Sequence, residues 1–289
     1  HSTVEGAFKT PAALEGNYIT CKGQRARFLR RADPGTIAWD VLGADVVFEC
    51  TGRHKTREAL AKHVAQGAKC VISSTPADDQ VPVVVRGINC QRIPKGESII
   101  SCGSSSVQAL ALALKVLDEA FGLEAASMTT IHAYTGDQQL SDAAKGAGRW
   151  SRSAAQNIIP NTTWAPSVVE RLIPEFKGKI EGIALNVPVP AGSNIDLTAK
   201  LSRDATVAEV NEAVKKASEG AMKGLLGWTD EKIVSSDIIG DCRSAVLDSD
   251  ATLSIAGGLV KTLFWFDNGW SIAQRMLETA EIMNAKGGK

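Results

Sequence analysis

The sequence lacks the features that mark a membrane protein, a secreted protein or a partner of nucleic acid. Lys and Arg together number 32, as do Asp and Glu, so the formal net charge is zero. A balanced charge of this kind predicts neither a nucleic-acid partner nor a membrane surface. No apolar run approaches the roughly 20 residues that cross a bilayer. The first residues, HSTVEGAFKT, lack the pattern of a signal peptide.

Paired cysteines are also lacking. The six cysteines are scattered along the chain without a CxxC pair, and most of them lie in apolar runs. This distribution predicts reduced thiols in the cytoplasm, and it argues against a disulfide framework or a metal site.

A dinucleotide-binding glycine loop is the third missing feature. The stretch GAGRWS, residues 146–151, begins as G-x-G but ends in Ser, and it does not open an apolar helix after a strand. No other stretch of the sequence has the G-x-G-x-x-G spacing. A doubly wound domain in this chain therefore either binds no dinucleotide or lacks its first βαβ unit.

Alternating strands and helices are what the first part of the chain does contain. Apolar runs bounded by Gly and Pro are typical of strands buried in a parallel sheet. We expect strands at 44–52, 68–76, 81–89 and 97–103, with a helix over 56–67. This alternation predicts a Rossmann-like, doubly wound parallel sheet whose first βαβ unit is absent.

The second part of the chain mixes strands and helices without strict alternation, which predicts an α+β domain. We expect strands at 127–135, 178–190 and 194–202, a long strand or hairpin at 251–268, and helices at 206–220 and 271–283. The whole chain is thus expected to be an α/β protein with a second, α+β catalytic domain.

A cluster of serines joins the two parts. The stretch SIISCGSSSVQALALALKVL, residues 98–117, reads as a strand, a tight turn and a helix with apolar residues at helical spacing. Ser104, Ser105 and Ser106 stand at the start of that helix, where Ser supplies an N-cap. A strand-to-helix turn is also where an enzyme places a nucleophile, so both interpretations apply to this cluster.

Eight motifs in the same order resemble the glyceraldehyde-3-phosphate dehydrogenase family. They are GADVVFECTG, SSTPADDQVPVVVRGIN, SIISCGSSSVQALALALKVL, MTTIHAYTGDQ, RSAAQNIIP, KGKIEGIALNVPVP, VSSDIIGD and WFDNGWS. The resemblance implies NAD- or NADP-dependent oxidation of an aldehyde with inorganic phosphate, in a cytoplasmic homotetramer. It also implies a βαβ unit with the dinucleotide loop before the first residue, so we expect the native gene to encode more chain upstream.

The resemblance places Ser105 where the family has its nucleophilic Cys, and His132 where the family has its base. A thiol at a helix N-terminus beside an imidazole ionises near neutral pH, whereas a hydroxyl needs a base during attack. We therefore expect strongly reduced aldehyde oxidation. Cys102 could act instead, but a half-buried structural Cys is the interpretation that its place at a strand end favours.

Other positions carry over from the family in the same way. The resemblance implies cofactor contacts at Thr51, Gly52, Ser74, Thr75 and Asn268. It implies substrate or phosphate contacts at Ser104, Ser106, Thr135, Arg152 and Thr163. Arg152 is the strongest of these, because a guanidinium grips an oxyanion in bidentate fashion.

Four departures from the family pattern accompany Ser105. Trp164 replaces a Gly beside the phosphate site, and Asn186 replaces an Arg that binds the substrate phosphate. Losing a charged hydrogen-bond partner costs about 1.5–3 kcal/mol, which predicts a different or less charged ligand, or no ligand. Gly269 and Ile272 replace a Glu and a Tyr near the nicotinamide.

These observations predict an incomplete dinucleotide-binding domain, residues 1–104 and 269–289, and a catalytic domain, residues 105–268. Three interpretations of Ser105 stay open: a diverged dehydrogenase, an inactive pseudoenzyme with a binding or assembly role, and an enzyme engineered from Cys to Ser. Engineering explains Ser105 but not Trp164 or Asn186.

Overall fold

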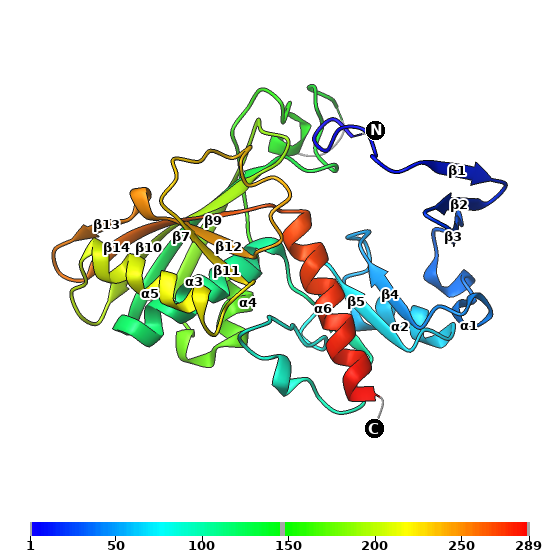
Figure 1. The fold of residues 1–289 in the computed structure, drawn as a ribbon, viewed down its shortest axis with the longest axis horizontal. Helices are drawn as coiled ribbons and strands as arrows, with labels where there is room; N and C mark the ends of the chain where they lie inside the picture. The colour runs from blue at the N-terminus through cyan, green and yellow to red at the C-terminus, as the bar shows by residue number, and fades with distance from the viewer. Residues whose placement is uncertain (1, 145–147, 288–289) are drawn as a thin grey trace.

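The computed structural model describes residues 2–144 and 148–287, which form three sheets (Figure 1). The first sheet is parallel, in the order β4 (Val46–Glu49), β5 (Cys70–Ser73) and β6 (Ile99–Ser101). Helix α2 (Arg57–Ala65) covers one face of this sheet: its Leu60 packs in one cluster with Val47, Val71 and Ile99 of the three strands. Helix α6 (Trp270–Gly287) packs with Cys70 and Ile72 through Met276.

Alternate residues of these strands thus meet two different helices, as strands covered on both faces do. This arrangement confirms the predicted parallel, Rossmann-like sheet. The short helix α1 (Trp39–Leu42) precedes β4. Five short 3-10 helices occur among the described residues, namely Pro34–Thr36, Cys90–Arg92, Gly148–Ser151, Pro174–Phe176 and Ser249–Ala251.

The second sheet has eight strands, in the order β11-β12-β14-β10-β7-β9-β8 with β13 paired to β14. Its strands are β7 (Leu123–Ala133), β8 (Ile159–Asn161), β9 (Ile180–Val187), β10 (Ser193–Leu201), β11 (Leu226–Thr229), β12 (Ala245–Asp248), β13 (Leu253–Ile255) and β14 (Leu259–Phe266). Parallel and antiparallel pairs both occur, and β13 and β14 form the expected hairpin. The predicted second, α+β part is confirmed.

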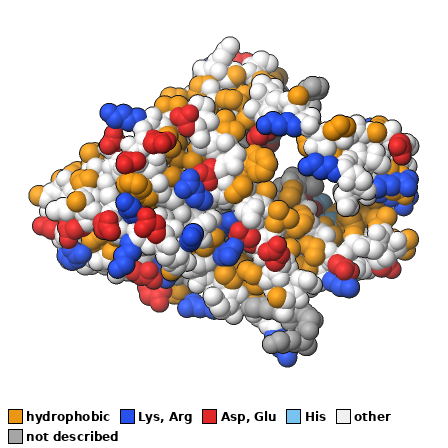
Figure 2. Space-filling view, viewed as in Figure 1, with side chains coloured by type: hydrophobic (Ala, Val, Ile, Leu, Met, Phe, Trp, Pro, Cys, Tyr) orange, Lys and Arg blue, Asp and Glu red, His pale blue; other side chains and the backbone are white. Residues whose placement is uncertain are grey.

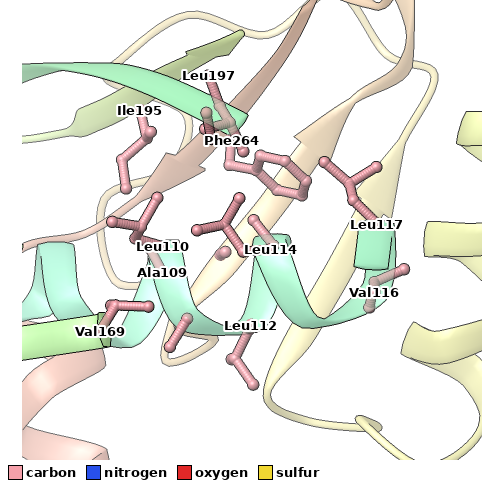
Figure 3. Packing of buried hydrophobic residues seen from close by; sticks show 14 of the residues in the cluster. Ala109, Leu110, Leu112, Leu114, Val116, Leu117, Val169, Ile195, Leu197 and Phe264 are labelled. Carbon is pink, nitrogen blue, oxygen red and sulfur yellow. The ribbon is translucent and has the colours of Figure 1, made fainter. Parts of the chain in front are cut away.

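Helix α3 (Ser105–Phe121) forms the centre of the larger core. Leu110 and Leu114 point toward Ile195 of β10 and Phe264 of β14 (Figure 3). Helices α4 (Ala165–Leu172) and α5 (Val207–Glu219) pack against α3. Burying a large aliphatic side chain contributes about 1.5–3 kcal/mol, so this core fixes the start of α3 firmly against the sheet.

Helix α6 lies between the parallel sheet and the large sheet (Figure 1). Its Arg275 is buried and donates to the carbonyl of Gly224 and to Ser244 Oγ, both at 3.4 Å. It also donates to Glu278 at 2.8 Å. A buried guanidinium is costly without partners, so these bonds join α6 to the loops beside the large sheet.

The third sheet was not foreseen from the sequence. It is antiparallel, with strands β1 (Ala12–Glu15), β2 (Tyr18–Cys21) and β3 (Gln24–Arg27). Its side chains are largely exposed, and the Arg25 guanidinium lies 3.6 Å from the centre of the Tyr18 ring. Short strands with few apolar residues carry a weak periodic signal.

The predicted strand at 81–89 is wrong. Only Val83 makes a bridge, to Ser101 of β6. The side chain of Asn89 accepts from Val85 N and donates to the Val83 carbonyl, both at 2.8 Å. Pro82 has no N–H to donate to a neighbouring strand. The Asn89 side chain bonds the Val85 N–H and the Val83 carbonyl, which a neighbouring strand would otherwise use, so the run folds back on itself.

Two further predictions concern particular segments. Residues 146 and 147 of GAGRWS lie outside the described residues, while Gly148–Ser151 form a 3-10 helix.

Within the described ranges, none of the helices is both long enough and apolar enough to cross a membrane. Basic and acidic side chains are interspersed over the face shown in Figure 2, as the balanced composition suggests.

Candidate active site

The start of α3 holds the three serines in different roles. Ser104 is the N-cap, and its Oγ accepts from Val107 N at 3.2 Å. Ser105 is the first helical residue and is only 7% exposed, and Ser106 is 8% exposed. Within residues 2–144 and 148–287 no hydrogen bond reaches Ser105 Oγ, so its hydroxyl is uncommitted at a helix end that favours developing negative charge.

Two buried side chains hold the turn before α3. Ser101 Oγ donates to the Thr75 carbonyl at 2.7 Å and accepts from Gly103 N at 2.9 Å. Gln108 Nε2 donates to the Cys102 carbonyl at 2.7 Å. The strand-end residue Thr75 and the turn that carries Ser105 are therefore tied together by one buried hydroxyl.

His132 lies near the end of β7. Its Nδ1 is 2.6 Å from the carbonyl oxygen of Ala133, and its ring meets the Phe266 ring edge-on at 6.2 Å. Because a carbonyl only accepts, Nδ1 carries the proton and Nε2 of the neutral ring keeps a free lone pair. Burial lowers the pKa of His132 below its ordinary value, although the Ala133 carbonyl acts in the opposite direction. The ring is thus a neutral base rather than a fixed cation.

A short chain of bonds runs from the base to Asn268, which follows β14. Ala133 N donates to Ser193 Oγ at 3.0 Å, and Ser193 Oγ donates to Asn268 Oδ1 at 3.4 Å. Asp267 holds the same loop by accepting from Gly269 N at 2.7 Å. With Oδ1 occupied, Asn268 presents its Nδ2 donor, which suits an amide carbonyl such as that of nicotinamide.

The residues expected to bind anions are engaged with near neighbours. Thr135 Oγ1 donates to the Asp137 carboxylate. Arg152 Nε lies 3.5 Å from Asp142 Oδ2, with more than half of each side chain exposed. Thr163 Oγ1 accepts from the backbone at the start of α4. A bound anion would have to replace these contacts or add to them.

Asn186 and Trp164 differ sharply in their surroundings. Asn186 is 7% exposed, and its Oδ1 accepts from Asn161 Nδ2 at 3.2 Å. Trp164 is 69% exposed at the start of α4, where its side chain makes no cap bond. The amide of Asn186 is therefore turned into the protein, where it supports the sheet beside His132.

The carboxyl ends of β4 and β5 place Thr51, Gly52, Ser74 and Thr75 on one edge of the parallel sheet. Open α/β sheets bind ligands at this edge. Gly52 has φ of +66°, and nothing lies within 4 Å of the position a Cβ would take. Hydroxyls beside an open glycine fit the sugar and amide groups of a dinucleotide, so the residues present are compatible with NAD(P).

Cys102 and Ile272 belong to the core. Cys102 is fully buried, with Sγ 3.4 Å from Thr279 Oγ1, and burial raises the pKa of its thiol to about 12. Such a thiol stays protonated and unreactive at neutral pH. Ile272 packs against the same cluster, which includes Cys70 and Met276. Cys102 therefore cannot replace Ser105 as a nucleophile.

Other features lie away from these residues. A cavity of about 820 Å³ is lined by Val46, Cys70 and Ser98, at the amino ends of the parallel strands. It lies at the opposite edge from Thr51 and Ser74. In the described ranges no three His, Cys, Asp or Glu side chains gather as a metal site would need.

Sequence reasoning missed the residues that support the site: Glu49, Ser101, Gln108 and Ser193. Glu49 accepts from Thr51, and the others hold the turn and the loop described above. Glu49 carried a signal, because it is an acidic residue inside an otherwise apolar run. The structure ties Thr75 to the turn of Ser105 and His132 to Asn268, but among the described residues it records no bond between Ser105 and His132.

Comparisons with known proteins all point to one family. The family described as "Glyceraldehyde 3-phosphate dehydrogenase, C-terminal domain" matches residues 101–268. The chain is 39% identical over 288 residues to the glyceraldehyde-3-phosphate dehydrogenase of Geobacillus stearothermophilus, a match that covers 99% of this chain and 86% of that protein. It is 41% identical over 280 residues to the protein of the same name from Streptomyces coelicolor, covering 96% and 83%. The corresponding protein of Phaeosphaeria nodorum is 38% identical over 279 residues, covering 96% and 82%.

Proposed function

Because this chain belongs to the glyceraldehyde-3-phosphate dehydrogenase family, we propose that it is an NAD(P)-dependent, phosphorylating aldehyde dehydrogenase with reduced or altered activity. The observation that carries this proposal is the uncommitted hydroxyl of Ser105 at the start of α3, in the place of the family's thiol. The proposed partners are a small aldehyde and inorganic phosphate. We expect a homotetramer in the cytoplasm, by analogy with the family.

The proposed chemistry assigns Ser105 as the nucleophile and His132 as its base. Ser105 Oγ would bond to the aldehyde carbon, while Nε2 of His132 takes up the hydroxyl proton. Bound NAD(P) supplies the oxidant that accepts the hydride. The resulting acyl group would sit on an oxygen ester, which phosphate attacks less readily than a thioester, and this step accounts for the reduced rate that we expect.

The residues around the nucleophile divide into two proposed sets. The cofactor set is Thr51, Gly52, Ser74, Thr75 and Asn268, and the substrate and phosphate set is Ser104, Ser106, Thr135, Arg152 and Thr163. The inward bond of Asn186 to Asn161 supports a less charged aldehyde, because this position contributes an amide instead of a guanidinium.

A catalytically inactive protein with a binding or assembly role is the second candidate. Two observations favour it: no bond joins Ser105 to His132 within the described residues, and Arg152 lies beside Asp142. Catalytic hydrogen bonds often form only when substrate is bound, so the two candidates differ in what turnover measurements would show.

The test compares the full chain with Ser105→Cys and with the neighbouring control Ser106→Cys. Each protein is mixed with NAD or NADP and a panel of phosphorylated and uncharged aldehydes, with and without phosphate, and formation of reduced cofactor is followed. We expect low wild-type turnover and a rise of at least about 100-fold in Ser105→Cys, within the range that one activated nucleophile or base contributes. Absence of turnover in both wild type and Ser105→Cys, together with no cofactor binding by calorimetry, would establish the inactive alternative.

A further inference from the structure

A buried chain of polar side chains lies beneath the carboxyl end of β4. Glu49 is 5% exposed and His63 of α2 is 4% exposed. Trp39 Nε1 donates to His63 Nδ1 at 3.1 Å, and His63 Nε2 lies 3.2 Å from Glu49 Oε2. Because an indole N–H only donates, Nδ1 must accept, so the proton of the neutral ring is on Nε2 and points at Glu49.

The other carboxylate oxygen of Glu49 faces the cofactor edge. Glu49 Oε1 accepts from Thr51 N at 2.8 Å and from the Thr51 hydroxyl. Burial alone raises the pKa of Glu49, but the hydrogen bonds from Thr51 and His63, with His54 nearby, hold it below its ordinary value. Glu49 is therefore an ionised carboxylate at neutral pH, with both oxygens occupied.

An ionised carboxylate can only accept hydrogen bonds. The Thr51 hydroxyl must therefore donate its single hydrogen bond to Glu49, and its lone pairs face away from the carboxylate. One of them accepts from Arg53 N at 3.2 Å. Thr51 is exposed, so the remaining lone pair is open to a ligand at the edge of the sheet.

We propose that Glu49 is a positioning residue that makes the Thr51 hydroxyl a fixed hydrogen-bond acceptor for a donor group of the dinucleotide. This role rests on the proposed cofactor site. The matching chemistry is a sugar hydroxyl or an amide N–H. A phosphate oxygen is excluded as the partner, because it has no proton to donate and Glu49 adds negative charge beneath the loop.

His63 and Trp39 make this polarity hard to reverse. In a Glu49→Gln variant the side-chain amide has one acceptor and one donor end, but both His63 Nε2 and Thr51 offer protons to it. Turning the amide oxygen toward His63 leaves an NH₂ group facing Thr51 N. Turning it toward Thr51 sets two donors against each other at His63, whose tautomer Trp39 fixes. Either orientation disturbs the Thr51 loop.

The test measures NAD binding to the full chain by calorimetry, for wild type, Glu49→Gln, Thr51→Val and the double variant. We expect each single variant to weaken binding by about 3- to 10-fold, the scale of one hydrogen bond. The double variant should bind no more weakly than Thr51→Val, because Glu49 acts through that hydroxyl. Glu97→Gln is the matched control: it alters another paired carboxylate, which lies before the amino end of β6 and not at the carboxyl ends that carry Thr51, and it should leave NAD affinity unchanged.

Independent losses that add in the double variant would overturn the proposal, as would unchanged affinity in a folded Glu49→Gln protein. If Glu49→Gln does not fold, the exposed Thr51 still decides: Thr51→Ser should bind like wild type and Thr51→Val should not, and equal affinity of the two would refute the role. Hydrogen exchange at the Thr51 and Arg53 amides should also quicken in Glu49→Gln without NAD. Failure of the unmutated chain to bind NAD would refute the cofactor site itself and this role with it, an outcome visible before any variant is made.

Discussion

His132 and Asn186 are register partners on the parallel strands β7 and β9, and both side chains donate to the carbonyl of Ala133. The histidine nitrogen is 2.6 Å from this oxygen and the amide nitrogen 3.5 Å. The contact fixes the imidazole with its lone pair on Nε2. It also turns the amide of Asn186 toward the protein interior, so one carbonyl orients the proposed base and its neighbour on β9 together.

His132 is expected to titrate below its ordinary pKa of 6.5, because burial disfavours the charged ring. In the window between the lowered folded pKa and 6.5, the unfolded chain binds a proton at this position that the folded chain does not. This difference stabilises the folded chain. Its contribution to the free energy of unfolding is fully present above pH 6.5 and declines as pH falls below 6.5. Two-dimensional NMR of the imidazole over this range measures the pKa directly.

The matched variant for this prediction is His132→Gln, which removes the titrating group. Its stability should change less between pH 7 and pH 5 than that of wild type, when unfolding is followed in urea at each pH. A His132 midpoint at or above 6.5 would contradict the burial argument.

Restoring a cation at Asn186 should restore affinity for phosphate. Asn186→Arg places a guanidinium beside His132, where the family resemblance expects a phosphate contact. Because the site is 7% exposed, we expect the variant to lose about 1–3 kcal/mol of stability without ligand. Added phosphate should raise its melting temperature by more than it raises that of wild type.

Ile183→Arg is the control for this variant. Ile183 lies on the same strand, three residues earlier and thus on the opposite face, and it is 51% exposed. It adds the same charge without placing it in the site. Equal phosphate-dependent shifts in the two variants would show that net charge, not position, is responsible.

The roles of the neighbouring serines should separate by stability. Ser104→Ala removes the N-cap bond to Val107 N and should cost about 1 kcal/mol. Ser106→Ala removes no cap bond and should change the free energy of unfolding by less than half as much. Urea unfolding of the two variants and wild type checks the difference, and an equal loss in both would refute the cap assignment.

The sequence allowed the elements around the site to be predicted, because their signals are local. The apolar spacing of α3 and the continuous run of β4 depend on burial of their own side chains. The same rule failed at 81–89, where α3 and α6 bury the apolar residues but only the single bridge of Val83 to Ser101 joins the run to a strand. The helix α4 was missed because it is only eight residues long and Trp164 gives it no cap signal, although Pro166 in its first turn is typical of a helix start.

The supporting contacts of the site could not be predicted, because each joins residues that are distant along the chain. Ser101 meets Thr75, and Ser193 meets Asn268, only after the strands have paired. The sequence shows a Ser in each case but not its partner. Glu49 is the intermediate case: its acidic side chain in an apolar run was visible, but the histidine that explains it comes from the following helix.

Gly103 should be the least replaceable residue of the turn before α3, which carries the proposed nucleophile Ser105. Its φ of +69° is one that L-residues rarely adopt, and an added Cβ would lie 2.9 Å from Val107 Cγ1. The left-handed conformation costs roughly 1–2 kcal/mol for a residue with a Cβ. The clash adds to this cost, because Val107 is buried in the larger core and cannot move aside. We expect Gly103→Ala to lower the free energy of unfolding by more than about 2 kcal/mol, measured in urea.

Gly136→Ala is the control, since nothing lies within 4 Å of its added Cβ, and it should be close to neutral. Adding Val107→Ala to Gly103→Ala should cost less than the sum of the two single losses, because the smaller side chain relieves the clash. Fully additive losses would show that backbone strain alone, and not packing against α3, fixes this turn.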